Sequence, residues 1–254
     1  MGRRIRVISY NIHKGFCTFN RFTLHRIKEA IRETGADLCF LQEVVGQNQK
    51  FASNITNWPS EAQFEFLADT IWPHYKYGQN AVFPERHHGN ALLSKYPILM
   101  SENISLSTNR FEQRGLLHCQ LHLPAEDGYP ETRLDVLNTH LNLLHSSRLI
   151  QTQRIITWAK TRVAAESPLI LAGDFNDWQG SLSPLFSQGL ELRESFLTHR
   201  GEHARSFPSH FPLMTLDRIY MRGLTITSTS VLNALPWIEL SDHLPLFVEF
   251  ELPG

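Results

Sequence analysis

The chain has 254 residues, of which 42% are hydrophobic and 19% charged, and its formal net charge at pH 7 is -1. This length can bury one large core, and because no Pro/Gly/Ser-rich linker divides the chain, we expect a single domain over residues 1–254. The near-neutral charge excludes the global basic excess that is typical of proteins that bind nucleic acid tightly and without specificity.

The chain has no apolar stretch of signal-peptide length and no segment that could span a bilayer. We therefore expect a cytoplasmic protein, and we expect it to be a monomer. Its three cysteines are widely separated, without the spacing of a metal site: Cys17, Cys39 and Cys119. The odd number and the separation favour buried free thiols over a disulfide framework.

The first predicted elements are a strand over residues 6–11, a helix over residues 22–34 and a second strand over residues 38–43. The helix is predicted because apolar residues recur at helical spacing, at Leu24, Ile27, Ala30 and Ile31. Gly35 follows as a suitable C-terminal cap.

Two more helices are predicted further along the chain. Apolar residues repeat at helical spacing from residue 64 to residue 71, directly before a proline. A longer helix is expected over residues 147–165, with Leu149, Ile156 and Val163 along one apolar stripe.

Short strand patterns occupy much of the remaining chain. In order, they cover residues 75–83, 90–94, 98–106, 116–123, 134–140, 168–172, 216–220, 224–232 and 246–250. Helices mixed with many strands indicate the α/β class, and so many strands need two sheets to pack compactly.

The most informative motif is GDFN at residues 173–176, directly after the apolar run 168–172. Alternate residues of an extended segment point the same way, so we expect Asp174 and Asn176 to face one reacting atom together. A carboxylate beside an amide suits the deprotonation of a water and the stabilisation of a developing oxyanion. The alternative is that both residues only shape a turn after the strand.

Other predicted strands also end in, or lead into, polar side chains, which makes a chance arrangement a poor explanation. These side chains are Asn11, Glu43, His140, Asp217, Asp242 and His243.

Taken in order, these segments resemble the endonuclease/exonuclease/phosphatase superfamily of metal-dependent phosphoesterases. The resemblance runs from Asn11 to His243, nearly the whole chain. More narrowly, NIHKG at 11–15, HGNA at 88–91 and GDFNDW at 173–178 resemble a small bacterial YbhP-like branch. The resemblance implies a four-layer α/β sandwich, in which two packed, mostly antiparallel sheets are flanked by helices and the site lies at one end.

The resemblance also implies a divalent metal ion, Mg²⁺ or Mn²⁺. Glu43 is expected as its main ligand, with Asn11 and Asp242 completing the shell. Such hard cations favour carboxylate and amide oxygens. An alternative role for Asn11 is to cap the end of its strand.

By the same resemblance, His140 and His243 contact the scissile phosphate. Asp217 is expected to accept the second ring N–H of His243, which fixes the ring and raises its pKa. His140 has no equally clear acidic partner in the sequence, so its role as acid, hydrogen-bond donor or orienter stays open.

Arg114 and Asn90 are expected to bind substrate phosphate. Each begins a strand, where a solvated charge or a turn residue is the plainer interpretation, but a planar guanidinium suits bidentate phosphate recognition. Abasic endonuclease relatives carry an acid two residues after the first Asn, whereas this chain has His13. The difference weakens a two-metal scheme, and it leaves the roles of His13 and Lys14 open.

The function predicted from these residues is hydrolysis of a phosphate ester by water, with no covalent intermediate. Asp174 would activate the water, and Asn176, His140 and His243 would stabilise charge on the phosphoryl oxygens. A phosphodiesterase or nuclease is favoured. The alternatives are a phosphomonoesterase or a phosphoesterase of phospholipids or inositol phosphates, and a catalytically silent binding module.

Overall fold

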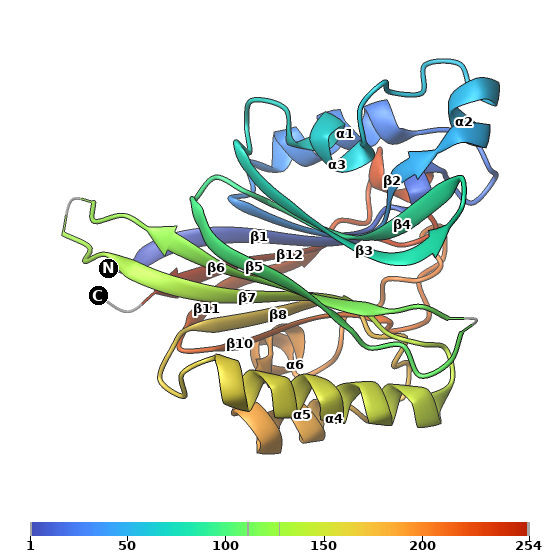
Figure 1. Cartoon of the computed structure of the whole chain (residues 1–254). Helices are drawn as coiled ribbons and strands as arrows, with labels where there is room; N and C mark the ends of the chain where they lie inside the picture. The colour runs from blue at the N-terminus through green and yellow to red at the C-terminus, as the bar shows by residue number, and fades with distance from the viewer. Residues whose placement is uncertain (1, 111, 127, 253–254) are drawn as a thin grey trace.

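The structure is a computed structural model that describes residues 2–110, 112–126 and 128–252. Two six-stranded sheets pack face to face, and helices cover both outer faces (Figure 1). The order of layers is therefore helix, sheet, sheet, helix, which is the four-layer α/β sandwich that the resemblance implied.

Each sheet is mixed but mostly antiparallel. The first contains, in spatial order, β11 (Thr225–Val231), β12 (Leu246–Leu252), β1 (Arg3–Asn11), β2 (Leu38–Asn48), β4 (Arg86–Ser94) and β3 (His74–Phe83). The second contains β5 (Ile98–Ser105), β6 (Gly115–Leu123), β7 (Thr132–His140), β8 (Leu169–Asp174), β10 (Asp217–Arg222) and β9 (Arg193–Glu194). Every strand predicted from the sequence is present, whereas β9 was not predicted.

One parallel strand pair in each sheet positions the polar strand ends. β1 runs parallel to β2, with Asn11 opposite Gln42, and β7 runs parallel to β8, with His140 opposite Asp174. Parallel strands end at the same edge of a sheet, so each pair delivers its C-terminal side chains to one place. β10 is antiparallel to β8 and begins at this edge, with Asp217 opposite Asp174.

The helices flank the two sheets. They are α1 (Leu24–Thr34), α2 (Gln49–Asn54), α3 (Gln63–Ala68), α4 (His145–Arg162), α5 (Ser183–Leu190) and α6 (Ser195–Arg200), with short 3₁₀ turns η1 (His13–Gly15) and η2 (Trp237–Glu239). In Figure 1, α1 and α3 lie over the first sheet, and α4 and α5 lie over the second. The start of β1 and the end of β12, where Arg3 pairs with Leu252, lie at the end of the sandwich away from α2 (Figure 1).

α1 confirms its prediction, because Leu24, Ile27, Ala30 and Ile31 are its buried face and Gly35 caps it in the left-handed conformation. The stripe predicted for the long helix was wrong at Leu149, whose side chain is 39% exposed. α4 begins two residues earlier than predicted and ends three residues earlier. Its buried face includes hydrogen-bonded polar residues such as Gln151, which a count of apolar residues overlooks.

Three apolar clusters bind the layers together. One fills the space between the two sheets, a second lies between the first sheet and α1 and α3, and a third lies between the second sheet and α4 and α5. All three cysteines are buried and free, as predicted. Among the described residues, the helices are too short or too polar to cross a membrane.

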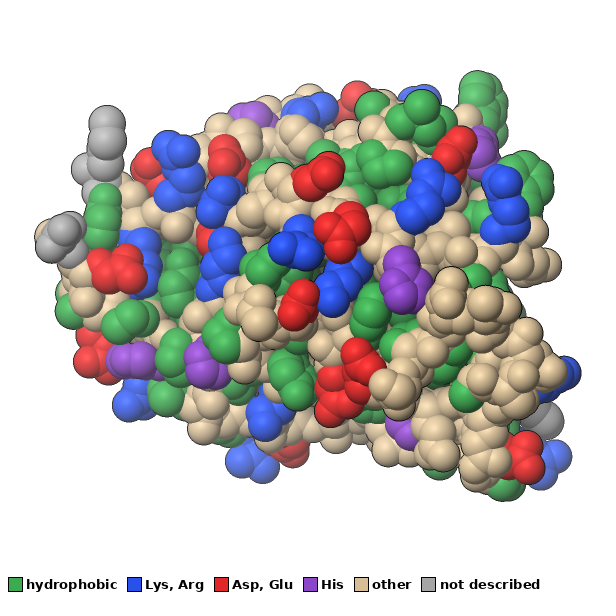
Figure 2. Space-filling model, turned by 90° about the horizontal axis from the view of Figure 1, so that it is seen from above, with side chains coloured by type: hydrophobic (Ala, Val, Ile, Leu, Met, Phe, Trp, Pro, Cys, Tyr) green, Lys and Arg blue, Asp and Glu red, His purple; other side chains and the backbone are tan. Residues whose placement is uncertain are grey.

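Acidic and basic side chains are interspersed over the face that carries α1 and α3 (Figure 2). No single-sign field covers this face, in keeping with the net charge of -1.

Candidate active site

Asp174 is the centre of a cluster of polar side chains at one end of the sandwich. Its Oδ2 accepts a hydrogen bond from Nδ2 of Asn11 at 3.0 Å. The same oxygen lies 3.4 Å from Nε2 of His140 and 3.7 Å from Nε2 of His243. Residues far apart in the chain, from both sheets, therefore converge on one buried carboxylate.

The backbone before Asp174 depends on glycine. Gly173 has φ +148°, and a Cβ atom there would lie 1.9 Å from the carbonyl oxygen of Thr139 on β7. Because β7 and β8 approach this closely, His140 and Asp174 are adjacent where the two strands end.

The geometric reason given above for pairing Asp174 with Asn176 was wrong, because β8 ends at Asp174 and Asn176 has φ +51°. The chain turns after the strand, so side chains no longer alternate. The backbone N–H of Asn176 donates to Oδ1 of Asp174 at 3.0 Å, and its side-chain amide donates to the carbonyl of Leu141 at 2.9 Å. Asn176 therefore fixes the Asp174 carboxylate and remains buried beside it.

His243 has the partner that was predicted for it. Its Nδ1 lies 2.8 Å from Oδ2 of Asp217, which also accepts a hydrogen bond from the hydroxyl of Ser206. Burial alone would lower the pKa of His243, but Asp217 and Asp174 outweigh it and raise the pKa to about 10. The ring is therefore a cation at neutral pH, and Phe207 packs against it with ring centroids 5.0 Å apart.

The pKa of His140 is shifted in the opposite direction to that of His243. Burial, together with the nearby positive charge of Arg114, holds the pKa of His140 well below its usual value. The sequence left its acidic partner open, and the structure places Asp174 itself 3.4 Å from Nε2. His140 is thus a neutral imidazole beside the carboxylate.

The pKa of Asp174 is raised to about 7. Burial is the main cause and the negative charge of Asp217 adds to it, while His243 and the hydrogen bond from Asn11 act in the opposite direction. A carboxylate with a pKa near the working pH is well suited to take a proton from water.

Glu43 is presented by a distortion of β2. The register of β2 on β4 shifts between Leu41 and Val44, and Glu43 itself has φ +55°. Such strain in a non-glycine residue is characteristic of functional sites. Burial alone would raise the pKa of Glu43, but the charge of Lys14 and its hydrogen bond to the carboxylate hold the pKa well below its usual range.

The Glu43 carboxylate has two neighbours in the site. Nζ of Lys14 lies 2.6 Å from Oε2, and Nδ2 of Asn11 lies 3.4 Å from Oε1. Asn11 thus joins Glu43 to Asp174, which supports its place in the site. Lys14, whose role the sequence left open, neutralises the predicted metal ligand.

Asp242 is connected to Asn11 through His13. Its Oδ1 accepts a hydrogen bond from Ser241 at 3.2 Å and lies 3.8 Å from Nδ1 of His13. His13 also donates its backbone N–H to Oδ1 of Asn11 at 3.0 Å. Among the described residues, no hydrogen bond or ion pair joins Asp242 to Glu43.

The donor set suits a hard divalent cation. Glu43 offers an ionised carboxylate, and Oδ1 of Asn11, which accepts the backbone N–H of His13, has a second lone pair to offer. In the described part of the chain, Asp174, Asp217 and His243 also form a group with ligand atoms within 4.8 Å of one another. However, Oδ2 of Asp217 already binds His243 and Ser206, so this group functions better as a hydrogen-bonded relay.

The two predicted phosphate ligands differ in their availability. Within the described residues, Nε of Arg114 is buried and has no hydrogen-bond partner, and its guanidinium lies 3.8 Å from Glu112. A buried, unpaired guanidinium donor beside His140 is suited to an anion. Asn90 instead donates to the carbonyl oxygens of Gly115 and Asn138 at 3.2 and 3.4 Å, so its amide nitrogen links the two sheets.

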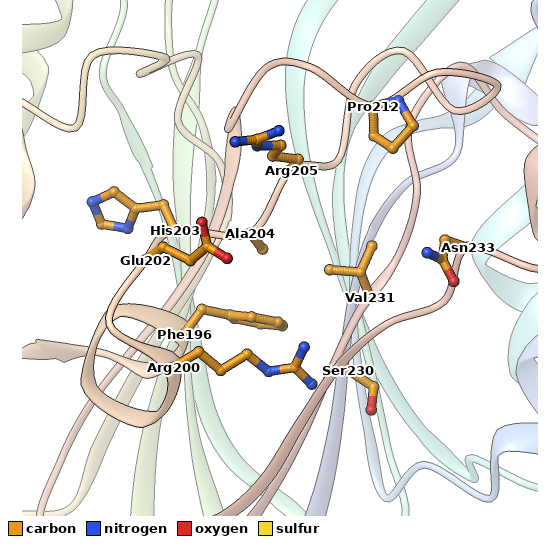
Figure 3. Close-up of a pocket in the computed structure, with 10 residues that line it drawn as sticks. All are labelled: Phe196, Arg200, Glu202, His203, Ala204, Arg205, Pro212, Ser230, Val231 and Asn233. Carbon is orange, nitrogen blue, oxygen red and sulfur yellow. The ribbon is translucent and has the colours of Figure 1, made fainter.

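A cavity of about 470 Å³ lies elsewhere, between α6 and β11 (Figure 3). None of its lining residues was predicted as a site residue. Arg200 on its wall binds Thr229, and His203 binds Glu194. This hollow is therefore distinct from the cluster around Asp174.

Sequence reasoning missed the residues that support the cluster from behind. Ser206 binds Asp217, and Ser241 donates to the carbonyl of Asn11 at 2.8 Å. A serine in a loop carries no sequence signal of such a contact. The contact between Phe207 and His243 is likewise visible only in the fold.

A four-layer sandwich with carboxylates and histidines gathered at one end of both sheets defines a class, the metal-dependent phosphoesterases and nucleases. The chain belongs to the Endonuclease/Exonuclease/phosphatase family, whose model matches residues 8–243.

Similar proteins support this assignment. The uncharacterized protein YbhP of Escherichia coli (strain K12) is 40% identical over 248 residues, covering 97% of this chain and 96% of YbhP. The endonuclease/exonuclease/phosphatase from Beutenbergia cavernae has a TM-score of 0.75 at 20% identity, covering 99% of this chain and 72% of that one. Zebrafish (D. rerio) TDP2 complexed with a single-strand DNA product has a TM-score of 0.64 at 17% identity, covering 98% and 99%. The two structures are similar in fold.

Proposed function

We propose that this protein is a divalent-metal-dependent hydrolase of phosphate diesters that acts by in-line attack of water. The observation that carries the proposal is the position of Asp174, whose Oδ2 lies within 3.7 Å of both His140 and His243. A carboxylate with a raised pKa between two imidazoles supports the role of Asp174 as the base.

The roles follow from the electrostatic state of each group. Asp174 would hold the attacking water and take its proton. His243, kept cationic by Asp217, would donate to a non-bridging phosphoryl oxygen and stabilise the charge that develops there. His140 would donate a hydrogen bond as a neutral ring, and Asn176 would keep the carboxylate in position.

Glu43 and Asn11 are the residues that would hold Mg²⁺ or Mn²⁺. Such an ion, when bound, supplies Lewis-acid polarisation of the phosphoryl group. Arg114 has an unpaired buried donor for a phosphate oxygen. Asp242, through His13, would steady Asn11 from the far side.

A diester is favoured over a monoester for a structural reason. A monoester carries a second negative charge, whereas the buried acids Asp174 and Asp217 already bring negative charge to the site. The complex of D. rerio TDP2 with a DNA product supports a nucleic-acid diester as one candidate. A phospholipid headgroup is another diester with the same chemistry.

The test is hydrolysis of bis(para-nitrophenyl) phosphate and para-nitrophenyl phosphate, each with Mg²⁺ and with Mn²⁺. We expect the diester to be cleaved faster. Asp174→Asn and His243→Gln should each lower kcat/KM by about two orders of magnitude, the usual scale for losing a general base or a charge-stabilising donor.

The matched control is His118→Gln. His118 is also buried and also bonds an acid, with Nε2 at 2.7 Å from Asp135, but this pair lies beneath α4. This variant should keep wild-type kcat/KM. Equal activity in wild type, Asp174→Asn and His243→Gln would refute the proposed function.

A further inference from the structure

Large apolar side chains are exposed around the candidate active site. Four loops near the cluster carry them, and each is between 44% and 69% exposed. We call this set the apolar rim: Phe19, Leu143, Leu144, Trp178, Phe211 and Leu213. Contiguous exposed apolar surface of this kind is unusual in a soluble protein and marks an interaction site.

Contacts between the loops make the rim continuous. The ring of Phe19 lies 5.5 Å from that of His210, next to Phe211. The hydroxyl of Thr215 donates to the carbonyl of Trp178 at 3.5 Å, which joins the loop of Leu213 to that of Trp178. The buried Arg148 then lies over the Trp178 ring at 4.7 Å and donates to the carbonyl of Leu143.

The rim adjoins the catalytic cluster because of the chain path. Leu143 comes three residues after His140, and Trp178 comes four residues after Asp174. Phe211 and Leu213 belong to the loop that leads into Asp217 and contains Phe207, which packs on His243. A surface that bound the rim would therefore lie directly over the site.

The chemistry of the rim favours lipid over nucleic acid. Bases stack on aromatic faces, but three of the six rim side chains are leucines, which offer no face for stacking. Leucine, phenylalanine and tryptophan together are the side chains that enter the interfacial layer of a bilayer. Exposed aliphatic groups gain most by leaving water for acyl chains.

Charge near the rim favours an anionic surface. The rim loops, residues 16–22, 141–146, 178–182 and 201–215, contain one acid, Glu202, against Arg21 and Arg205. The guanidinium of Arg21 lies 6.0 Å from the centre of the Phe19 ring, so charge and apolar surface adjoin, as in proteins that bind headgroups.

We propose that the apolar rim docks this protein onto an anionic lipid bilayer, so that its substrate is a phosphodiester in a lipid headgroup. This proposal builds on the phosphoesterase function proposed above. Docking itself does not need catalysis, so the two can fail separately.

The test is co-sedimentation of the full chain carrying Asp174→Asn with sucrose-loaded vesicles. One set is pure phosphatidylcholine, and the other contains about 30% phosphatidylglycerol. We expect binding to the anionic set. The double variants L143S/L144S and F211S/L213S, made in this chain, should each weaken binding at least about tenfold, because apolar side chains withdrawn from the bilayer lower partitioning multiplicatively.

The control is L99S/M100S. Leu99 and Met100 are a similarly exposed apolar pair, but they lie on β5 at the end remote from the site. All substituted positions are exposed, and circular dichroism checks that each variant is folded. Absence of vesicle binding, or equal binding of rim and control variants, would overturn docking. So would binding of a single-stranded oligonucleotide, lost in the rim variants, in place of vesicle binding. Diester hydrolysis in wild type would then still stand.

Discussion

Lys14 and Glu43 form a contact that opposes metal binding. The ammonium lies 2.6 Å from the carboxylate that is the predicted main ligand, and Lys14 has φ +59° in the strained turn η1. The Lys14 ammonium must move away from Glu43 before a divalent ion can bind there. Lys14 would therefore compete with the proposed metal ion, and it would become free to contact phosphate when that ion is bound.

Lys14→Met should raise the affinity for Mg²⁺ about tenfold, because it removes a competing positive charge while keeping most of the side-chain volume. Isothermal titration calorimetry without substrate measures this directly. Lys28→Met is the control, since Lys28 pairs with Asp69 at 3.0 Å on the outer surface. An affinity that stays the same or falls in Lys14→Met would contradict competition.

At the residue scale, the sequence predicted which side chains belong to the candidate site better than it predicted the contacts between them. Asp217 was matched to His243 because the resemblance supplied the pair, and the geometry agrees. The neighbour of His140 was missed, since it is Asp174, which had already been given another role. A partner set by strand register cannot be read from spacing alone.

At the scale of elements, the junction of β7 and β8 determines the site. Gly173 permits the close approach of the two strands, with φ +148° and no room for a Cβ beside Thr139. Because the strands approach this closely, His140 and Asp174 lie opposite each other where the two strands end. The glycine of GDFN is therefore a packing requirement as well as part of a motif.

Gly173→Ala should destabilise the fold by about 3 kcal/mol or more, because the added methyl group meets a backbone carbonyl in a forbidden conformation. Gly201→Ala is the matched control. Gly201 also has positive φ, +80°, but nothing lies within 4 Å of its missing Cβ, so we expect a cost of about 1 kcal/mol. Urea unfolding measures both, and equal losses would show that conformation alone matters.

The boundaries and buried faces of the helices and strands show what a pattern of apolar residues does not predict. Strands and α1 were predicted well because their buried faces are apolar. The stripe of α4 was misread because Gln151 and Arg148 are buried through hydrogen bonds to backbone carbonyls. The distortion at Glu43 was also missed, since β2 continues to Asn48 beyond the predicted strand end.

At the scale of the whole molecule, the site is shared between two sheets. The first sheet supplies Asn11 and Glu43, and the second supplies His140, Asp174 and Asp217. The resemblance predicted two packed sheets, but the hydrogen bonds between polar side chains that connect the sheets are visible only in the structure. The geometry of the candidate site therefore depends on how the two sheets are positioned relative to each other.

Asn138 provides that link beneath the site. From β7 it donates to the carbonyls of Leu41 and Ala91 on the facing sheet, at 3.0 and 2.8 Å, and it accepts from Gln42 at 2.8 Å. Buried polar groups left without partners cost about 1–3 kcal/mol each. Asn138 thus connects the two sheets beneath the site, as Asn90 does from the first sheet.

Asn138→Leu should lower the free energy of unfolding by about 2–4 kcal/mol and should lower diester turnover more than the loss of folded protein explains, because the two sheets can then shift. Denaturant unfolding and kcat measured well below the melting temperature separate the effects. Asn54→Leu is the control, since Asn54 donates its side-chain hydrogen bond to the carbonyl of Lys50 within the exposed helix α2, away from the contact between the sheets. Wild-type turnover in a destabilised Asn138→Leu would mean that each sheet holds its catalytic residues independently.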